Sequence, residues 1–553
     1  MSDATQSGPM LAADGTPLKQ SLARSLRRQK MRALGLIAPL LIFVLVSFIW
    51  PIAVMLFRSV ENSMVEDTIP SVVEALDEWN ATSGTVPPEP VFQAMYYDMF
   101  LAAEAKAHTR LGTRLNYEES GMSSLFRQTG RSLDDLGKDY QKIARGVNGD
   151  WNDAGAWYEL MTDGGTGNSS AALDAAFTRV DGLTNEELVN SLGFGLSADI
   201  AALLPNTTRA YADFAAFEGI VDEKDISGRK PWESVYPALF QDLSVANVAS
   251  YSGARADMLQ ELAANLDGVD APSYSATFAD LDEDWANPAT WATIKTHSVT
   301  YTNGYFLNAV DMRRTPEGAQ SQPEDKQILI KLFGRTIVMS LIITGSCILL
   351  AYPVAYILSN LPMRTSNLLM ILVLLPFWTS LLVRTSAWKV MLQQQGVIND
   401  TLVWLGLVDD AARLVIINNQ IGTIVAMTHI LLPFMILPMY SVMATIPPSY
   451  VRAAKSMGAT NWTTFWRIYF PQSIPGIGAG SILVFILAIG YYITPEIVGG
   501  TKGVFISNRI AYHISSSLNW GLAAALGTIL LAVVLILYWA YDKIVGIDNV
   551  KLG

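Results

Sequence analysis

The stretch from Tyr450 to Pro471 contains the residues whose types and spacing most clearly suggest a task. Ala453 and Ala454 are small enough to let another protein surface approach closely. Gly458 follows at a distance that suits a helix C-cap or a turn. We therefore predict a short helix, a glycine break and a second short helix, a shape suited to docking rather than to bond chemistry.

We call this predicted helix–turn–helix the knob. The second half of the stretch indicates which of its residues would pack against the rest of the protein. Asn461 can cap the second helix. Phe465, Ile468 and Tyr469 recur at helical spacing, so they would share one apolar face. Pro471 is expected to stop this helix just before the next apolar run. The predicted product is an amphipathic helix–turn–helix.

Four other residues are candidates for lining a solute path. Trp378, Tyr491 and Tyr492 could form aromatic walls that attract an ammonium group by cation–π contact, and Glu496 could pair with a cation. The alternative for the aromatic residues, which their positions favour, is an interfacial belt. Glu496 also fits a structural ion pair or a cap, so both interpretations stay open.

Enzymatic and metal-site signatures are weak in this sequence. Cys347 is the single cysteine, which excludes an intrachain disulfide, and the histidines are too dispersed to predict a metal site: His108, His297, His429 and His513. No Gly-x4-Gly-Lys-[Ser/Thr] motif occurs, so the chain is not expected to hydrolyse ATP. Adjacent carboxylates such as Asp134 and Asp135 do not share a helix face. No metal, cofactor or catalytic residue is predicted.

The elements that must position these residues are membrane spans. The chain has 553 residues, 51% hydrophobic and 16% charged, which is less charge than a soluble protein of this length usually carries. Six apolar runs approach the roughly 20 residues needed to cross the hydrocarbon core. They are Leu34 to Phe57, Thr336 to Leu358, Leu368 to Trp388, Ile421 to Ala444, Gly476 to Ile493 and Leu522 to Trp539.

Glycines mark the fifth run as unusual. It is short and carries Gly476, Gly478 and Gly480, which favours close helix packing or a broken helix. We predict an all-α polytopic membrane protein with six transmembrane helices.

Composition divides the chain into five parts. We expect a basic tail (1–32), a first transmembrane helix (33–58), an acidic domain (59–326), helices 2 to 6 (327–541) and a second tail (542–553). Segment 450–475 then lies between spans four and five. The basic flank before span one predicts that both termini and this segment are cytoplasmic, and that the acidic domain is external.

The acidic part is predicted to be a folded, mostly helical domain. It carries 42 acidic and 18 basic residues, a net charge of −24, in a chain whose total is −12. Its many aromatic residues distinguish it from disordered acidic tracts. Helical periodicity is visible in Ser132 to Ile143 and in Ala171 to Leu192. At this length the domain can bury its own core.

The stretch after Tyr450 resembles the coupling loop of binding-protein-dependent permeases of the type I ABC importer class. That family's pattern is Glu-Ala-Ala, three residues, Gly, nine residues, Ile, one residue, Leu, Pro. The matching positions here are Ala453, Ala454, Gly458, Ile468 and Pro471. Two positions depart from the pattern, with Arg452 in place of Glu and Phe470 in place of Leu. The resemblance covers about Gly35 to Arg58 and Leu332 to Tyr541.

Within that class the chain looks closest to the spermidine/putrescine permeases. The resemblance rests on Leu375 to Thr385, Leu431 to Phe434 and Ile493 to Gly500. Some members have Gly-Glu-Phe before the last of these, whereas this chain has Gly490, Tyr491 and Tyr492. A large external insertion after span one is also unusual for that group, and resembles maltose-type permeases in architecture only.

The resemblance implies the permease subunit of an ATP-driven importer in the bacterial inner membrane, working by alternating access. The implied solute is a polyamine or another organic amine, with amino-acid derivatives and sugar-amine conjugates as alternatives. Implied partners are a second permease subunit, two ATPase subunits that bind ATP and Mg, a periplasmic solute-binding protein and membrane lipid, with no nucleic acid. The coupling residues implied are Arg452, Ala453, Ala454, Gly458, Phe465, Ile468 and Pro471.

The acidic domain has three possible roles: a docking platform for the binding protein, a field that steers cationic solute, or a stabilising module. The field would be limited by screening over about 8 Å. The rival class is a membrane-anchored enzyme or sensor with an external domain. The sequence identifies neither the solute nor whether the permease pair is homo- or heterodimeric.

Overall fold

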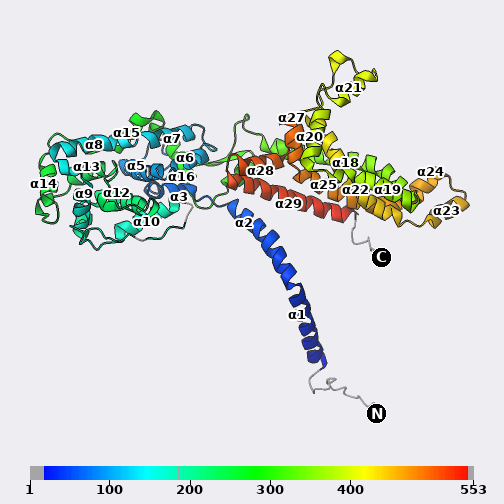
Figure 1. Cartoon of the computed structure of the whole chain (residues 1–553), viewed down its shortest axis with the longest axis horizontal. Helices are drawn as coiled ribbons and strands as arrows, with labels where there is room; N and C mark the ends of the chain where they lie inside the picture. Colours follow the sequence, from blue (N-terminus) through cyan, green and yellow to red (C-terminus); the bar gives the residue numbers. More distant parts are fainter. Residues whose placement is uncertain (1–17, 185–186, 191, 546–553) are drawn as a thin grey trace, which may run out of the picture.

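The computed structural model describes residues 18–184, 187–190 and 192–545. Of the two predicted tails, residues 1–17 and 546–553 lie outside the described residues. A bundle of long helices carries the 59–326 domain at one end and segment 450–475 at the opposite end (Figure 1). The chain is thus a two-part, largely helical protein, as its periodicity predicts.

Among the described residues, five helices are long and apolar enough to cross a membrane, or six if one bent pair counts as a span. The elements outside the 59–326 domain are α1 (Leu18–Val44), η1 (Leu45–Ile49), α2 (Trp50–Arg58), α18 (Leu329–Asn360), α19 (Met363–Leu374), η7 (Leu375–Trp378), α20 (Leu381–Met391), α21 (Val397–Trp404), α22 (Gln420–Ala444), α23 (Pro448–Ser456), α24 (Asn461–Thr464), η9 (Phe465–Tyr469), α25 (Phe470–Gly490), α26 (Ile493–Val498), α27 (Gly500–Gly503), α28 (Ile506–Ser515) and α29 (Trp520–Val545).

The core of the bundle is the packing of α22 against α18 and α25. Glycines on α25 permit this approach. A Cβ added to Gly480 would lie 2.6 Å from Met435 Sδ, and one added to Gly476 would lie 3.1 Å from Met439 Cα. In lipid the hydrophobic effect does not drive helices together. Small residues at such contacts allow close van der Waals packing instead. Of the two predictions for this glycine-rich run, close packing is the one the structure shows.

The third predicted span is not one straight helix. The segment Met363–Trp378 and helix α20 meet at 90°. Pro376 lies in η7, and Ser380 caps the new helix by accepting a hydrogen bond from Val383 N at 3.2 Å. A proline followed by an N-cap serine is chemistry that ends one helix and begins another. The apolar run from Leu368 to Trp388 therefore contains a sharp corner.

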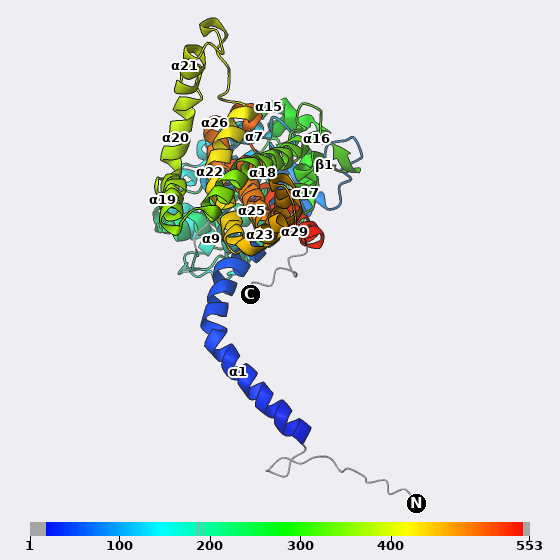
Figure 2. The ribbon, with the colours of Figure 1, turned by 90° about the vertical axis from the view of Figure 1, so that its right-hand side faces the viewer.

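The first span stands apart from the bundle. The continuous helix through α1, η1 and α2 leaves the junction with the domain and runs away from the other helices (Figures 1 and 2). None of the most apolar window within Gln29–Arg58 is buried. Apart from the contact of α2 with α29 near Met55, its side chains are therefore free to contact lipid or another subunit.

The 59–326 domain is built from fifteen α-helices, short 3₁₀ and π turns and one antiparallel hairpin, counted over its described residues. The elements are α3 (Met64–Thr68), α4 (Pro70–Leu76), α5 (Glu89–Glu104), α6 (His108–Leu115), α7 (Met122–Ser132), α8 (Asp134–Val147), α9 (Ala154–Thr162), α10 (Ala171–Leu183), α11 (Ala198–Leu203), α12 (Pro205–Ala216), α13 (Val235–Leu243), α14 (Ala256–Ala264), α15 (Tyr274–Leu281), α16 (Pro288–Thr296), α17 (Gly304–Ala309), β1 (Met312–Thr315) and β2 (Gly318–Ser321).

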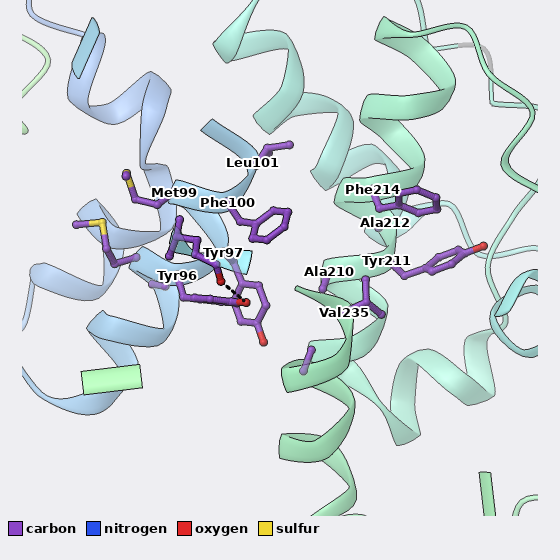
Figure 3. Close-up of a cluster of buried hydrophobic side chains, with 14 of the residues drawn as sticks. Tyr96, Tyr97, Met99, Phe100, Leu101, Ala210, Tyr211, Ala212, Phe214 and Val235 are labelled. Carbon is purple, nitrogen blue, oxygen red and sulfur yellow. Dashed lines mark hydrogen bonds between the residues drawn. The ribbon is translucent and has the colours of Figure 1, made fainter. Parts of the chain in front are cut away.

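Aromatic side chains fill the domain's core, with α5 at its centre (Figure 3). Tyr97 of α5 and Tyr274 of α15 share a hydrogen bond between their hydroxyls at 2.7 Å. Asp98 of α5 is also buried, and its carboxylate accepts hydrogen bonds from the backbone N–H groups of Ser71 and Val72 at the start of α4. Aromatic burial and satisfied polar groups explain why an acidic sequence folds here.

The two periodic stretches in the domain are helical, although one is shorter than predicted. Ser132 to Ile143 corresponds to α8, but the helix expected over Ala171 to Leu192 ends at Leu183. Thr184 has an extended conformation, with ψ at 156°, and closes that helix. The extension to Leu192 was therefore wrong.

Candidate functional site

The glycine break in segment 450–475 is a Schellman motif that ends α23. Ala459 N donates to Ala454 O at 3.1 Å, and Gly458 N donates to Lys455 O at 3.0 Å. Gly458 has a φ of +89°, a left-handed conformation that glycine adopts without a Cβ penalty. The predicted short helix and turn are confirmed as local structure.

The second helix differs from prediction at both ends. Thr460, not Asn461, is its N-cap, and its hydroxyl accepts a hydrogen bond from Thr463 N at 3.2 Å. Pro471 does not stop the helix, because α24, η9 and α25 continue as one helix from Asn461 to Gly490. A wide π turn just before Pro471 accommodates its ring.

The apolar face of this segment is held against the end of α18. Phe465 lies 6.0 Å from Tyr352, and Tyr469 lies 5.0 Å from Tyr356, measured between ring centroids. The Tyr469 hydroxyl also shares a hydrogen bond with Ser359 Oγ at 3.1 Å. Tyr352 and Tyr356 were not predicted, although their i, i+4 spacing places them on one helix face. The knob is thus anchored to the bundle through aromatic contacts.

The opposite face of the segment is exposed. Met457 at the turn is 82% exposed and Trp462 is 72% exposed, whereas Ala454 is only 4% exposed. Arg452 and Ala453 are also exposed. Ile468 is half-buried, as its predicted place on the apolar face requires. The segment carries three basic residues and no acidic residue, so its free surface is positively charged.

Three of the four pathway candidates lie around Asn508 of α28. Asn508 Nδ2 donates to Glu496 Oε2 at 2.6 Å and to Tyr492 O at 2.9 Å. Ser507 Oγ donates to Tyr491 O at 2.7 Å. These bonds join α26, α28 and the end of α25. Glu496 therefore takes part in a structural hydrogen bond while its side chain stays exposed.

Trp378 does not contact the three residues around Asn508 through a hydrogen bond or a ring contact that the described part of the chain shows. It lies in η7 and is 69% exposed. Among the described residues, no hydrogen bond or ring contact joins Trp378 to Tyr491, Tyr492 or Glu496. The structure thus brings three of the predicted residues together, whereas Trp378 lies exposed at the bend of the third span.

A buried polar cluster, which sequence reasoning missed, lies where the 59–326 domain meets the bundle. We call Asn62, Arg114, Glu118, Tyr305 and Asn308 the junction cluster. Arg114 Nη1 donates to Glu118 Oε1 at 2.7 Å, and Arg114 Nε donates to the Tyr305 hydroxyl at 3.1 Å. Asn308 Nδ2 donates to Glu118 at 3.0 Å, and the Tyr305 hydroxyl donates to Asn62 Oδ1 at 3.1 Å. All five residues are buried.

Charge balance in the junction cluster fixes its protonation states. Burial alone would raise the pKa of Glu118, but Arg114 and His297 beside it bring that pKa below its ordinary value. Burial lowers the pKa of His297 to about 4. The cluster therefore holds a charged Arg114–Glu118 pair beside a neutral imidazole at physiological pH.

The 59–326 domain contacts two membrane helices, through Asp311 and through Tyr305 of the junction cluster. Asp311 caps α18, since its carboxylate accepts hydrogen bonds from Leu329 N and Ile330 N, both at 2.9 Å. Tyr305 packs against Gly521 of α29, where an added Cβ would lie 2.4 Å from the ring. The domain is thus fixed to the ends of α18 and α29 by contacts as well as by the chain.

Across the described residues, no group of three or more His, Cys, Asp or Glu side chains is placed to hold a metal ion. Cys347 is buried in α18.

Comparison with known proteins identifies the membrane part of the chain. The family model for the binding-protein-dependent transport system inner membrane component matches residues 331–545. This match begins after the 59–326 domain. The domain therefore lies outside the part that the family model describes.

Two sequence relatives align over a length similar to that of the family model. The spermidine/putrescine transport system permease protein PotB of Escherichia coli (strain K12) is 35% identical over 211 residues, which cover 38% of this chain and 76% of that protein. The inner membrane ABC transporter permease protein YdcU of the same organism is 32% identical over 258 residues, covering 44% of this chain and 80% of that protein.

Among solved structures, a bacterial ABC transporter involved in the import of the acidic polysaccharide alginate aligns with a TM-score of 0.34 and 19% identity. It covers 42% of this chain and 82% of that chain. The sequence relatives are the stronger finding, because this chain covers 76% of a permease to which it is 35% identical. The chain belongs to the inner-membrane components of binding-protein-dependent transport systems: it is a multi-pass permease subunit of the type I ABC importer class, in the group of the spermidine/putrescine permeases, and not an enzyme.

Proposed function

We propose that this permease moves a polyamine or a related organic amine across the inner membrane, driven by ATP hydrolysis in partner subunits. The observation that carries the ATP-driven mechanism is segment 450–475. It is a rigid knob with a glycine turn, an exposed basic face and an aromatic anchor on α18. Closure of an ATPase on this knob would pull α22 and α25 together, because the knob connects them directly.

Alternating access follows from how the knob is mounted. α22 and α25 pack closely through Gly476 and Gly480, and both pack on α18. A force on the knob would therefore be delivered to three packed helices as a unit rather than lost in a flexible loop. Rocking of such a unit against a second permease subunit would open the path to each side in turn.

The proposed partners are a second permease subunit, two ATPase subunits that bind ATP and Mg, and a periplasmic solute-binding protein. The basic flank before the first span favours cytoplasmic termini and a cytoplasmic knob. The 59–326 domain lies at the opposite end of the bundle and is then external (Figure 1). The exposed first span offers its apolar surface to lipid or to the second permease.

We assign the external domain the role of a docking platform for the binding protein. Its buried attachment to α18 and α29 supports this role, because a docked partner would push on the membrane helices directly. Deletion of residues 59–325, with the flanking helices joined by a short linker, should weaken or abolish uptake while the ATPase subunits still co-purify. Turnover of a substrate by the separately produced domain would contradict a role confined to transport.

The solute assignment rests on the names of the relatives and on one polar site. The backbone carbonyls of Tyr491 and Tyr492 and the carboxylate of Glu496 lie around Ser507 and Asn508, and oxygen atoms of these kinds can accept hydrogen bonds from an ammonium group. The test is thermal stabilisation of the partner binding protein by spermidine, putrescine, amino acids and sugar-amine conjugates. Stabilisation by the diamine and triamine supports the proposal, and stabilisation by neutral sugars alone would refute the amine assignment but leave the permease role intact.

A further inference from the structure

A cavity of about 360 Å³, lined by both apolar and charged residues, lies in the external domain, beside the junction cluster. Its walls come from α16, from the β1–β2 hairpin, from the two glutamates that follow α6 and from the loop at residues 81–84. Helix α16 and strand β1 lie next to each other (Figure 2). A cavity of this size is at the lower end of the range that small-molecule sites occupy, roughly 300–1,000 Å³.

The cavity carries both signs of charge in a strongly acidic domain. Arg313 and Arg314 contribute two of the domain's 18 basic residues, and Glu119 and Glu317 face the same space. The Arg313–Glu119 ion pair is long, at 4.0 Å, and its side chains are 37% and 50% exposed. Such a pair contributes little stability by itself. A ligand with complementary charges can therefore separate these two residues at small cost.

Two nitrogen atoms on residues that line the cavity have no hydrogen-bond partner among the described residues. They are Arg313 Nε and His297 Nδ1, and both atoms are buried. The guanidinium Nε–H can only donate, so it requires an acceptor such as a carboxylate oxygen. Because this atom is itself buried, a ligand in the cavity would reach it only after a shift of the Arg313 side chain, which is 37% exposed. Buried polar atoms without partners are uncommon in native proteins, and each calls for an explanation such as an ordered water or an ion.

We propose that this cavity binds a small zwitterion. Its carboxylate would accept hydrogen bonds from Arg313, and its ammonium group would lie against Glu119. This site is separate from the proposed transport path, since the cavity is in the external domain and the path candidates are in α26, η7 and the end of α25. It does not depend on the identity of the transported solute.

Glu118 and His297 connect this cavity to the membrane helices. Both line the cavity, Glu118 belongs to the junction cluster, and His297 contacts Glu118 at 3.8 Å. The same cluster contains Tyr305, which packs on α29. A bound ligand would therefore stabilise the contact between the external domain and the bundle, in addition to the domain itself.

The test is calorimetric titration of the full-length protein in nanodiscs with four probes: 4-aminobutyrate, glutamate, putrescine and succinate. We expect the two amino acids to bind, and both Arg313→Gln and Glu119→Gln to weaken that binding about tenfold or more, the loss expected for one charge-assisted hydrogen bond. The control is Arg255→Gln, in an exposed ion pair with Glu159 that lies outside the cavity. This variant should bind like the parent protein.

Three results would overturn the proposal. Putrescine or succinate binding as tightly as the amino acids would contradict the assigned pair of charges. No binding of any probe at millimolar concentration would show that only water occupies the cavity. Unchanged binding in the Arg313→Gln and Glu119→Gln variants, with unfolding midpoints equal to that of the parent protein, would place the ligand elsewhere. None of these results would bear on the proposed transport of the solute, which is tested separately.

Discussion

The aromatic ring of Tyr305 lies directly on the backbone of Gly521, which places the 59–326 domain against the start of α29. A Cβ added to Gly521 would lie 2.4 Å from two ring carbons of Tyr305. The same tyrosine accepts a hydrogen bond from Arg114 and donates one to Asn62, so its ring cannot move without disturbing the junction cluster. One glycine thus sets how closely the two parts of the molecule approach.

Replacing Gly521 with alanine should therefore destabilise the protein, although alanine favours helices more than glycine does. The added methyl group must displace a buried ring, and overpacking of this kind costs roughly 1–3 kcal/mol. We expect a lower thermal unfolding midpoint of the full chain in nanodiscs and reduced binding-protein-dependent uptake. The matched control is Gly345→Ala in α18, where an added Cβ meets nothing within 4 Å in the part of the chain that the structure describes. Equal midpoints for the two variants would contradict the contact.

The Arg114–Glu118 pair should behave as a buried ion pair. Both side chains are about 5% exposed or less, and the bond between them is 2.7 Å long. Glu118→Leu would leave the Arg114 charge buried without its partner, which typically costs about 3–5 kcal/mol. Thermal unfolding of the full chain measures this loss.

Two further variants separate the ion pair from simple packing. Arg114→Met combined with Glu118→Leu should recover much of the lost stability, because no unpaired charge then remains. Asp139→Ala removes the partner of Lys142 in a pair that is more than 70% exposed on both sides. We expect that change to stay within about 0.5 kcal/mol. A larger loss from Asp139→Ala than from Glu118→Leu would refute the assignment.

His297 should make stability depend on pH. Burial lowers the pKa of His297 to about 4 in the folded protein, from an ordinary value of 6.5. Below pH 6.5 the unfolded chain therefore binds a proton that the folded protein refuses, so stability falls as the pH drops from about 6.5 to about 4. The pKa of Glu118 is lowered as well. The stability that Glu118 contributes is therefore lost only when the pH falls below about its ordinary pKa of 4.5. The range between pH 4.5 and 6.5 thus separates the effect of His297 from that of Glu118.

The measurement is the unfolding midpoint of His297→Gln and of the parent protein across that range. The variant should show a flatter profile. Burial also lowers the pKa of His513 to about 4, so some slope should remain in the variant. Parallel profiles for the two proteins would mean that His297 does not contribute.

Long apolar runs were the most predictable part of the fold. The fourth span was predicted as Ile421 to Ala444 and is α22, Gln420–Ala444. An unbroken apolar run has few alternatives to a helix in a membrane. The third span was less predictable, because the mean hydropathy of a segment does not reveal a 90° bend between two helices. The signal was present in Pro376 and Ser380, but it is turn chemistry, which an average over some twenty residues hides.

The junction cluster shows what pattern reasoning misses. Glu118 and Glu119 are neighbours of one type, yet Glu118 is 8% exposed and Glu119 faces a cavity and pairs weakly with Arg313. The difference comes from residues about 190 positions away along the chain: Asn308 donates to Glu118, and Tyr305 accepts from Arg114, the ion-pair partner of Glu118. Local sequence cannot reveal a buried ion pair whose surroundings are built by distant segments.

Segment 450–475 was predictable in outline because its signals are local. The spacing of Ala454 and Gly458 predicted a helix and a turn, and both are present. The errors at Asn461 and Pro471 arose because two adjacent residues can both cap a helix, and because a π turn lets a helix pass through a proline. The functional role of the segment stays a prediction.

That role can be tested at Gly458 without a steric clash. An added Cβ there would meet no atom of the described residues within 4 Å, so a substitution acts only through the left-handed backbone. Valine in that conformation costs roughly 1–2 kcal/mol, whereas asparagine tolerates it. In proteoliposomes with the partner subunits, Gly458→Val should lower solute uptake per ATP hydrolysed, because the turn that presents the knob is distorted. Gly458→Asn should retain most of the coupling.

Gly406 provides the matched control for backbone strain. It also has a left-handed φ, +69°, and free space around its Cβ position, but it lies beyond α21, far along the chain from the knob. Gly406→Val carries the same kind of strain and should leave the ratio of uptake to hydrolysis unchanged. If Gly406→Val uncoupled the transporter as strongly as Gly458→Val, the effect would reflect general instability. Normal coupling in Gly458→Val would remove the turn from the proposed mechanism.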